Sequence, residues 1–465
     1  MAEPAAPLQP PAGGHIIRTQ RSQRQPRLFA FSPDRALNMD LIVKPGSLEG
    51  LVPVPGSKSH TIRGLIVGML AGGVSHMGRP LRSADTESCV HVCEALGARV
   101  EAAADDSEWL IHGTGGRPQA SEEVVDVGNS GTTLFLAMTA AALAEGCTEF
   151  TGDEQIRVRS AKPLIAALRS LGATAYSVRG TGCAPIVVGG GLDGGRVRIE
   201  CPTSQYLSSL LIGCPLAGDR TTIEVPLLNE RPYVQMTMAW LDEMGIRYEA
   251  AEDLSRFELP GGQRYAAYAK DVPADFSSAT FFLVAAAVTG SRLFLRGLDM
   301  SDTQGDKAVV NMLKEMGCVV SAERGGISIE GPDELRGGTF DLNATPDALP
   351  GMAVAGCMAR GETRLVNVPQ ARIKETDRIA VMARELSRMG AEVEEMPDGL
   401  VLRQARLRGA EVDGHGDHRV VMALAVAGLA AEGTTTIHTA EAAAVTFPNF
   451  VELMRQAGAE MTLRP

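Results

Sequence analysis

The sequence predicts an α/β fold of two domains, each built from three copies of one repeating unit. A chain of 465 residues, 45% of them hydrophobic, exceeds the size at which a single hydrophobic core stops growing. Small polar residues that precede apolar helical runs recur at spacings of 72, 74, 74, 70 and 70, at Ser57, Asn129, Thr203, Ser277, Asp347 and Asp417. Glycines that follow a second helical pattern recur with a similar period, at Gly97, Gly172, Gly245, Gly317, Gly390 and Gly458. Two independent markers with one period indicate six repeats over residues 40–465.

Each repeat is expected to contain two helices and several strands. The recurring polar residues are all helix N-cap types, and each helical run leads through a turn into a short β-branched stretch. The recurring glycines suit the left-handed conformation that ends a helix. A helix start leaves backbone N–H groups free to bind anions. One such cap by itself only stabilises its helix, but six in register favour a shared anion-binding cleft between the two domains.

The net charge and the cysteines limit the partners and the compartment. With a formal charge of −12 and a pI near 5.3, the chain would repel nucleic acid and anionic membrane surfaces, so we expect neither as a partner. Its eight cysteines include no CxxC pair, which is typical of reduced thiols in a cytoplasmic protein. The longest uncharged apolar segment, residues 420–431, has 12 residues, fewer than the roughly 18 that span a bilayer.

Residues 1–38 differ in composition from the rest of the chain. They hold six prolines, five arginines and two acidic residues, and they lack the apolar run of a signal peptide. This composition predicts a disordered N-terminal tail. A targeting segment, or an extension ahead of a start at Met39, fits the same composition.

Residues suited to anion binding gather where the repeats begin. The segment PGSKSHTIR, residues 55–63, places Lys58, Ser59 and Arg63 at the start of the first helix, so two cations and a hydroxyl join the exposed N–H groups. Its spacing differs from that of a Walker A loop. The segment VGNSGTT contains Gly131, which permits either a close backbone approach to a ligand or a tight turn.

The following repeats add further donors. Arg159 lies in a loop after the second repeat begins, and the segment PTSQYLSS contributes Thr203, Ser204 and Gln205. These three side chains or their amides can donate hydrogen bonds to phosphate or carboxylate oxygens. The fourth repeat, with DFSSATFF, has a cap but no reactive group, and we assign it a structural role.

The last two repeats supply candidates for proton transfer. The segment TPDALP contributes Asp347. In QARIKETDR, Lys374 and Arg378 are four residues apart and are expected to share one face of a helix. Glu375 between them fits either a catalytic group or a solvated ion-pair network. The segment HGDHRVVMA contributes His418, and because its two histidines lack further ligands, no metal site is expected.

The combined set indicates group transfer between phosphorylated molecules. Its cations are sized for two anionic substrates and comprise Lys58, Arg63, Arg159, Lys374, Arg378 and Arg419. Asp347, Glu375 and His418 are left to transfer protons. The sequence has no metal motif, dinucleotide-binding fingerprint or cofactor lysine setting, so we expect no cofactor and a reaction driven by positioning, charge stabilisation and acid–base catalysis.

The segments PGSKSH, GNSGTT, TSQ, KETDR and DHR, in this order and spacing, resemble the EPSP synthase family over most of the chain. The resemblance implies a two-domain inside-out α/β barrel, with three βαβαββ repeats per domain and the active site in the interdomain cleft. It divides the chain into residues 39–56 plus 273–465 and residues 57–272. It also implies that the domains close on their ligands about hinges near Gly56 and Val272.

The same resemblance implies which residues bind each substrate. Phosphoenolpyruvate would be bound by Lys58, Gly131, Arg159, Gln205, Arg378 and Arg419. Shikimate 3-phosphate would be bound by Lys58, Ser59, Arg63, Thr203, Ser204, Gln205, Asp347, Gln370 and Lys374. Thr203 and Gln370 replace a serine and an asparagine of the family and keep the type of hydrogen bond.

The activity that the resemblance implies is transfer of the enolpyruvyl group from phosphoenolpyruvate to the 5-hydroxyl of shikimate 3-phosphate. The hydroxyl attacks C2 while C3 is protonated, and the tetrahedral adduct then expels inorganic phosphate. Asp347 would be the base, and Glu375 and Lys58 would move protons, with His418 near Glu375. These two small molecules would be the only partners of a cytoplasmic monomer.

Three positions depart from the family pattern. Glu230 stands where many members have a serine on the shikimate phosphate, so its carboxylate is expected to repel that ligand unless the neighbouring Arg231 turns it away. Phe135 stands where an arginine often occurs, and Val445 where some members have a lysine for phosphoenolpyruvate. The site is therefore expected to carry less positive charge than in those members.

Two alternatives to this interpretation stay open. A sister enolpyruvyl transferase would use a different hydroxyl acceptor. The branch that acts on UDP-N-acetylglucosamine usually carries a catalytic cysteine in the loop after the second repeat, and residues 152–163 contain none, whereas an acceptor without a ring phosphate would suit Glu230 and Phe135. The second alternative is a catalytically silent binding module of the same fold, against which the retained acid–base residues argue.

Overall fold

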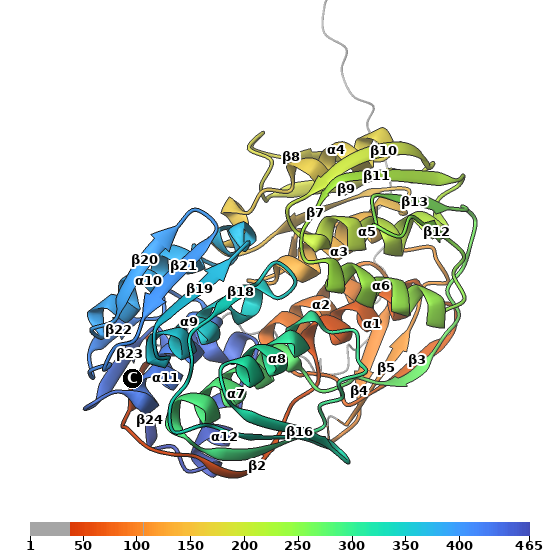
Figure 1. Cartoon of the computed structure of the whole chain (residues 1–465). Helices are drawn as coiled ribbons and strands as arrows, with labels where there is room; N and C mark the ends of the chain where they lie inside the picture. Colours follow the sequence, from red (N-terminus) through yellow and green to blue (C-terminus); the bar gives the residue numbers. More distant parts are fainter. Residues whose placement is uncertain (1–37, 106) are drawn as a thin grey trace, which may run out of the picture.

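A computed structural model describes residues 38–105 and 107–465 and has two lobes, each with its own hydrophobic core (Figure 1). The core of the central lobe is formed within residues 62–272. The core of the terminal lobe combines residues 41–52 with residues 274–461. The first and last parts of the chain thus fold together, and the segment between them forms the other lobe.

The central lobe contains six α-helices and twelve β-strands among the described residues. In chain order these are α1 (Lys58–Leu70), β3 (Val74–Gly78), α2 (Ala84–Ala95), β4 (Arg99–Ala102), β5 (Glu108–His112), β6 (Val125–Asp126), α3 (Gly131–Ala142), β7 (Cys147–Thr151), α4 (Lys162–Ser170), β8 (Thr174–Ser177), β9 (Ile186–Gly189), β10 (Gly195–Cys201), α5 (Ser204–Gly213), β11 (Thr221–Leu228), α6 (Arg231–Glu243), β12 (Glu249–Ala250), β13 (Arg256–Leu259) and β14 (Ala269–Asp271).

The terminal lobe has the same numbers of described α-helices and strands. They are β1 (Asp40–Val43), β2 (Glu49–Pro53), α7 (Phe276–Thr289), β15 (Arg292–Arg296), α8 (Ala308–Glu315), β16 (Val319–Glu323), β17 (Gly326–Glu330), β18 (Thr339–Asp341), α9 (Leu349–Met358), β19 (Glu362–Val366), α10 (Arg378–Arg388), β20 (Glu392–Met396), β21 (Gly399–Arg403), β22 (Glu411–Asp413), α11 (His418–Ala430), β23 (Thr435–His438), α12 (Phe450–Gln456) and β24 (Met461–Arg464).

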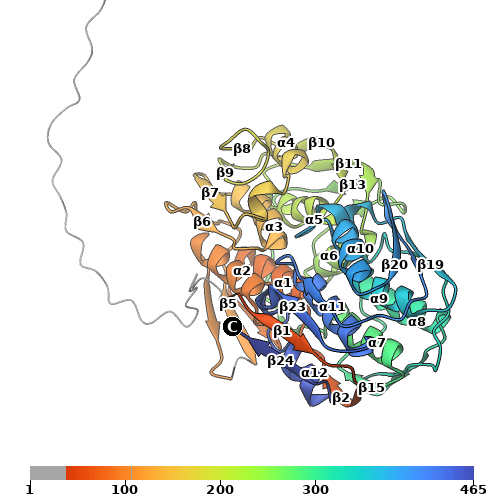
Figure 2. The ribbon, with the colours of Figure 1, turned by 90° about the vertical axis from the view of Figure 1, so that its left-hand side faces the viewer.

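The strands form six four-stranded sheets with one common topology. In the second repeat, β6 pairs parallel with β7, and β7, β9 and β8 follow in antiparallel order. Two sheets each include one strand from a distant part of the chain. In one of them β2 pairs with β15, and in the other β14 pairs with β3. A third sheet places β1 between β23 and β24, so that the two ends of the fold lie side by side (Figure 2). The predicted six-repeat α/β architecture is confirmed.

Three helices are buried at the centre of each lobe, with the sheets outside them. In the central lobe these are α1, α3 and α5, and in the terminal lobe α7, α9 and α11. All but one of the 13 residues of α11 are buried, as expected of a helix that is apolar on every side. The helix that follows in each repeat, such as α4 or α10, buries only one face. This arrangement lets the starts of the buried helices point toward the other lobe.

The predicted ends of the second helices are confirmed. The six glycines have positive φ angles between 67° and 111°, at Gly97, Gly172, Gly245, Gly317, Gly390 and Gly458. A residue with a side chain rarely adopts this conformation, whereas glycine adopts it without strain. The glycine period in the sequence therefore reports a real repeat of backbone geometry.

The predicted helix starts are only partly correct. Three predicted N-caps are observed, at Ser57, Thr203 and Asp417. Helix α3 is capped by Ser130 rather than Asn129, and α7 by Asp275 rather than Ser277. In both cases the observed cap has a side-chain oxygen that accepts a hydrogen bond from the third helical N–H. Asp347 is not a cap, because it lies within the short 3₁₀ turn Pro346–Ala348 that precedes α9.

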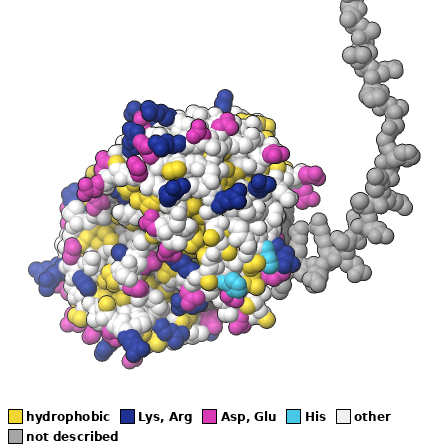
Figure 3. All heavy atoms as spheres, turned by 90° about the vertical axis from the view of Figure 1, so that its right-hand side faces the viewer, with side chains coloured by type: hydrophobic (Ala, Val, Ile, Leu, Met, Phe, Trp, Pro, Cys, Tyr) yellow, Lys and Arg dark blue, Asp and Glu magenta, His cyan; other side chains and the backbone are white. Residues whose placement is uncertain are grey.

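The predicted tail, residues 1–38, lies outside the described residues except for Asn38. Within residues 38–105 and 107–465, no helix combines the length and the apolar character needed to cross a bilayer. All eight cysteines are free thiols. On the face drawn in Figure 3, acidic and basic side chains of the described residues are interspersed with apolar ones.

Candidate active site

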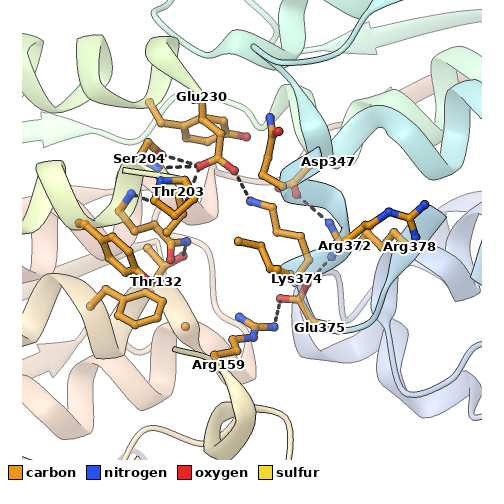
Figure 4. A pocket seen from close by; sticks show the side chains of 18 of the residues that line it. Thr132, Arg159, Thr203, Ser204, Glu230, Asp347, Arg372, Lys374, Glu375 and Arg378 are labelled. Atoms are coloured by element: carbon orange, nitrogen blue, oxygen red, sulfur yellow. Dashed lines mark hydrogen bonds and ion pairs between the residues drawn. The ribbon is translucent and has the colours of Figure 1, made fainter. Parts of the chain in front are cut away.

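A pocket of about 460 Å³ lies between the two lobes. Its lining includes every residue that the sequence assigned to the site, namely Lys58, Ser59, Arg63, Gly131, Arg159, Thr203, Ser204, Gln205, Asp347, Gln370, Lys374, Glu375, Arg378, His418 and Arg419. Those from the central lobe face those from the terminal lobe across the opening (Figure 4). The tertiary structure thus brings together segments more than 350 residues apart.

Helix starts from both lobes converge on the pocket. Its lining includes the first residues of α1, α3, α5, α10 and α11, which are Lys58, Gly131, Ser204, Arg378 and His418. The N-terminus of a helix offers free N–H groups and a partial positive charge, so this convergence favours anionic ligands. The expected convergence of all six repeats is only partly observed, because residues of α7 and α9 do not line the pocket. The fifth repeat contributes Asp347 from the 3₁₀ turn before α9 instead.

Gly131 allows an arginine to lie against the start of α3. A Cβ atom at this position would clash with Nη1 of Arg159. Arg159 itself is nearly buried, with 10% of its side chain exposed, and its Nη2 lies 2.9 Å from Oε1 of Glu375. The close approach permitted by this glycine is therefore made by an arginine side chain.

Asp347 is held between two arginines of the terminal lobe. Its two carboxylate oxygens lie 2.8 Å from Nη1 of Arg378 and 2.9 Å from Nη2 of Arg419. Burial alone would raise the pKa of Asp347, but the charges of Arg419, Lys374 and Arg378 hold it well below its usual value. Asp347 is thus ionised and paired with both arginines.

Arg378 is the centre of the carboxylate network. Its guanidinium group is buried and contacts Asp347, Glu375 and Asp417. Burial lowers the pKa of Arg378, and the three carboxylates outweigh this effect and raise the pKa above its ordinary value. Asp417 also caps α11 through the N–H of Arg419 at 2.9 Å, so the cap of the sixth repeat also fixes an arginine of the pocket.

One expectation for the KETDR segment is wrong, and one of the two alternatives for Glu375 is excluded. Lys374 and Arg378 do not share a helix face, because Lys374 ends the 3₁₀ helix Pro369–Ile373 and α10 begins only at Arg378. Glu375 is not part of a solvated surface network either. Its side chain is 11% exposed and pairs with Arg159 of the other lobe and with Arg378, and although burial raises its pKa, these arginines hold that pKa well below its usual value. The loop conformation between the two helices is what turns both side chains into the pocket.

His418 and Gln370 present polar atoms without a partner among the described residues. Nε2 of His418 and Oε1 of Gln370 are buried and accept or donate no hydrogen bond there. Burial lowers the pKa of His418 well below 6.5, and nearby Lys58 adds to this effect while Glu375 opposes it. A buried polar atom is costly unless it is hydrogen-bonded, so both atoms are suited to a polar ligand.

The cations of the central lobe are held in place by a neutral acceptor and one carboxylate. Nζ of Lys58 lies 3.0 Å from Oδ2 of Asp85. Arg63 is buried, with Nε 2.8 Å from Oγ1 of Thr237, and burial lowers its pKa to about 10. Gln205 donates from Nε2 to Oγ1 of Thr132 at 3.0 Å. These contacts fix how far the side chains of Lys58, Arg63 and Gln205 extend into the pocket.

Glu230 points into the pocket, and Lys374 rather than Arg231 neutralises it. The carboxylate is 2% exposed and forms an ion pair with the ammonium group of Lys374 across the two lobes. It also accepts hydrogen bonds from Ser204 and Thr203. The position that departs most from the family pattern is thus part of the site itself.

The other two departures have different environments. Phe135 lines the pocket and packs edge-to-face on Tyr206, with ring centroids 5.1 Å apart. Val445 ends the 3₁₀ helix Ala440–Val445 and does not line the pocket. One wall of the pocket is therefore apolar.

The structure adds pocket residues that sequence reasoning missed. They include Asp85, Thr132 and Tyr233. The hydroxyl of Tyr233 donates to Oδ2 of Asp306 in the other lobe at 2.6 Å. Tyr233 could have been found from its position three residues after Glu230. No pattern in the sequence links Asp85 to Lys58, which is 27 residues away.

The fold and this pocket define an enzyme that transfers a group between anionic small molecules held between two domains. The profile of EPSP synthase (3-phosphoshikimate 1-carboxyvinyltransferase) matches residues 42–454. The chain is 53% identical over 424 residues to the 3-phosphoshikimate 1-carboxyvinyltransferase of Acetivibrio thermocellus, covering 91% of this chain and 99% of that protein. It is 49% identical over 425 residues to the protein of the same name from Ruminiclostridium cellulolyticum, covering 91% and 100%. This chain belongs to the EPSP synthase family.

A solved structure has the same architecture. The EPSP synthase of Acinetobacter baumannii superimposes with a TM-score of 0.78 at 28% identity, covering 92% of this chain and all of that one. Because the match covers 92% of this chain, the likeness extends over both lobes. The inside-out α/β fold that the resemblance implied is confirmed.

Proposed function

We propose that this chain transfers the enolpyruvyl group of phosphoenolpyruvate to the 5-hydroxyl of shikimate 3-phosphate and releases inorganic phosphate. Two relatives that match this chain over nearly their whole length carry the name of this activity. The observation that carries the proposal is the pocket between the lobes in which all the cations and carboxylates picked from the sequence meet. Such a pocket can hold two phosphorylated substrates and exclude water when the lobes close.

The two substrates occupy different parts of the pocket in this proposal. Phosphoenolpyruvate binds near the starts of α3, α10 and α11, where Arg159, Arg378 and Arg419 lie. Shikimate 3-phosphate binds between the starts of α1 and α5 and the loop before α10. Lys58 lies where it reaches both substrates. The three arginines are now paired with Glu375, Asp347 and Asp417, and the anions of phosphoenolpyruvate would compete with these carboxylates.

Competition for the arginines explains how a strongly acidic carboxyl group can serve as a base. Asp347 is ionised but a weak base while Arg378 and Arg419 are bound to it. When the anions of phosphoenolpyruvate take over these arginines, the pKa of Asp347 rises toward its ordinary value. Asp347 then accepts the proton of the acceptor hydroxyl as that oxygen forms its bond to C2.

Protonation and phosphate departure follow from the other side of the site. Lys58 and Glu375, with His418 beside Glu375, move the second proton. The ammonium group of Lys58 delivers it to C3, so that attack at C2 gives a tetrahedral adduct. The carboxylate of Glu375 takes a proton from C3 as the C2–O bond to phosphate breaks, which restores the double bond. Arg159, Arg378 and Arg419 offset the charge on the departing phosphate. Each step uses only groups that line the pocket.

The remaining expectations follow the same proposal. The domains are residues 39–56 plus 273–465 and residues 57–272, with hinges near Gly56 and Val272. Support comes from the two segments of chain that run from one lobe to the other. They are joined by a hydrogen bond of 2.8 Å from the N–H of Ser57 to the carbonyl of Pro273. We propose a cytoplasmic monomer with two small-molecule substrates and no nucleic-acid or membrane partner.

Inorganic phosphate release is the direct test. Purified protein is incubated with phosphoenolpyruvate in buffer treated with EDTA, with and without shikimate 3-phosphate. Release that needs both substrates is the expected result. Folded protein that releases no phosphate from both together would overturn the proposal, and a different hydroxyl acceptor would become the better hypothesis.

A further inference from the structure

Glu230 is a buried carboxylate whose two oxygens are both occupied. Oε2 accepts hydrogen bonds from the backbone N–H of Ser204 at 3.0 Å, from Oγ of Ser204 at 2.7 Å and from Oγ1 of Thr203 at 3.2 Å. Oε1 is bound by the ammonium group of Lys374. Figure 4 shows the carboxylate between these donors. The donors thus surround one anionic group from two lobes.

These donors make up a site for an anion whether or not Glu230 is present. Ser204 is the first residue of α5, and a helix N-terminus with a hydroxyl and an ammonium group is an arrangement that binds phosphate. Thr203, Ser204 and Lys374 are also among the residues proposed above to bind the acceptor. A carboxylate and a phosphate group cannot accept the same hydrogen bonds at once, so the two anions exclude each other.

The backbone aims Glu230 at the pocket instead of at its own helix. Glu230 is the N-cap of α6, with φ 57° and ψ 42°, yet its side chain accepts no capping hydrogen bond from α6. Acidic N-caps ordinarily use their carboxylate for such a bond. The left-handed conformation is also unfavourable for a residue with a side chain. The contacts across the pocket are therefore what hold the side chain in this position.

We propose that Glu230 is a specificity-determining residue that competes, inside the protein, with the anionic group of the acceptor. This inference rests on the proposed function. In the structure Glu230 neutralises Lys374 and joins the two lobes. An acceptor phosphate displaces it and takes over Ser204, Thr203 and Lys374, so the bridge between the lobes is kept by the ligand. A dianionic phosphate has the charge to displace a carboxylate, whereas an uncharged acceptor does not.

Equilibrium binding without phosphoenolpyruvate tests the competition separately from catalysis. Glu230→Gln keeps the size of the side chain and one acceptor oxygen but removes the charge. We expect the dissociation constant of shikimate 3-phosphate, measured by titration calorimetry, to fall by roughly ten-fold or more in this variant. Inorganic phosphate, used as a second probe, should also bind more tightly. Glu200→Gln, at an exposed glutamate on β10 of the same lobe, is the matched control and should leave both constants unchanged.

A second variant keeps the test decisive if the glutamine variant folds poorly. Glu230→Gly fits a φ of 57° without strain and empties the anion site, so it should also tighten the binding of both probes. Unchanged or weaker binding in both variants, from protein with a normal melting transition, would overturn the proposal. Absence of phosphate release by the wild-type protein would instead contradict the proposed function, and tighter binding of inorganic phosphate to the variants would still support competition by Glu230.

Discussion

Carboxylates of the protein occupy the places where the charges of ligands are expected. Asp347 holds Arg378 and Arg419, Glu375 holds Arg159, and Glu230 holds Lys374. Unpaired buried charges are strongly destabilising, so a cationic pocket needs such partners while it is empty. At the scale of single residues, ligand binding is thus an exchange of one anion for another.

Asp347→Asn should separate binding from turnover. The amide cannot accept the hydroxyl proton, and general base catalysis contributes about 10²- to 10⁴-fold, so the turnover number should fall by that range. Dissociation constants for both substrates should change much less. Steady-state phosphate release and calorimetry measure the two effects, and Asp341→Asn, at an exposed carboxylate of the same lobe, is the control. Normal turnover in the Asp347 variant would remove this residue from the mechanism.

His418 should make the stability of the protein depend on pH below neutrality. Its pKa in the folded protein lies well below the ordinary value of 6.5, so the unfolded chain binds a proton that the folded chain does not. The free energy of unfolding is therefore fully retained above pH 6.5 and falls, at about 1.4 kcal/mol per pH unit, as the pH drops below it. Between pH 7.5 and 5.5, His418→Asn should lose about 1.4 kcal/mol less than the wild type.

Denaturant unfolding at the two pH values measures this difference. The same substitution at His76, whose side chain is half exposed, controls for the loss of one imidazole. An equal loss of stability in the His418 variant and the wild type would show that His418 takes up its proton in the folded state.

Close packing of helices positions their starts around the pocket. In the central lobe, α3 and α5 pack against each other, and Gly213 at the end of α5 faces Thr139 of α3. A Cβ atom on Gly213 would clash with Cγ2 of Thr139 and lie 2.9 Å from its Cβ. Gly131 and Ser204 begin these two helices. The distance between α3 and α5 near Gly213 therefore affects the positions of the donors at the helix starts.

Gly213→Ala should destabilise the protein by overpacking. Inserting a methyl group into a filled core costs about 1–3 kcal/mol, which chemical denaturation would detect. Adding Thr139→Ser should recover part of this loss, since it removes Cγ2 and keeps the hydroxyl that lies 2.7 Å from Oγ of Ser209. Gly46→Ala, where no atom lies within 4 Å of the added Cβ, is the control. Equal stability of Gly213→Ala and the wild type would show that the helices can separate freely.

The two lobes are joined by polar contacts across the pocket, in addition to the two segments of chain that connect them. Tyr233 of the central lobe donates to Asp306 of the terminal lobe, which also accepts from Ser277 at 2.8 Å and Thr345 at 2.5 Å. Burial raises the pKa of Asp306, with Asp347 adding to the effect. At the scale of the whole molecule, buried polar contacts of this kind join the two lobes.

Tyr233→Phe should shift the unliganded protein toward an open arrangement of its lobes. The substitution removes one donor to buried Asp306 and keeps the carbonyl of residue 233 that binds Arg63 at 3.1 Å. The radius of gyration from small-angle scattering should increase, and the KM of both substrates should rise several-fold because binding must close the lobes. Tyr248→Phe, which breaks a tyrosine–aspartate bond within one lobe, is the control. An unchanged radius and unchanged KM values would show that this contact does not govern closure.

Local features were predictable because they depend on neighbouring residues. The glycines that end the second helices have positive φ for reasons of backbone sterics alone. Helix starts were less certain where two cap residues stand close together, as with Asn129 and Ser130, since only the formed helix shows which oxygen reaches the third N–H. Lys374 and Arg378 were misplaced on one face because sequence spacing does not reveal that a loop separates the 3₁₀ helix from α10.

The sequence by itself determined the repeat, the fold class and the set of polar residues at the start of each unit. These follow from periodicity, capping chemistry and motif spacing, which are local properties. Only the tertiary structure decided which charge meets which. Lys374 and not Arg231 neutralises Glu230, and Arg159 pairs with Glu375 of the opposite lobe. Ion pairs between residues more than one hundred positions apart depend on how two separately formed cores dock, and no local pattern in the chain encodes that geometry.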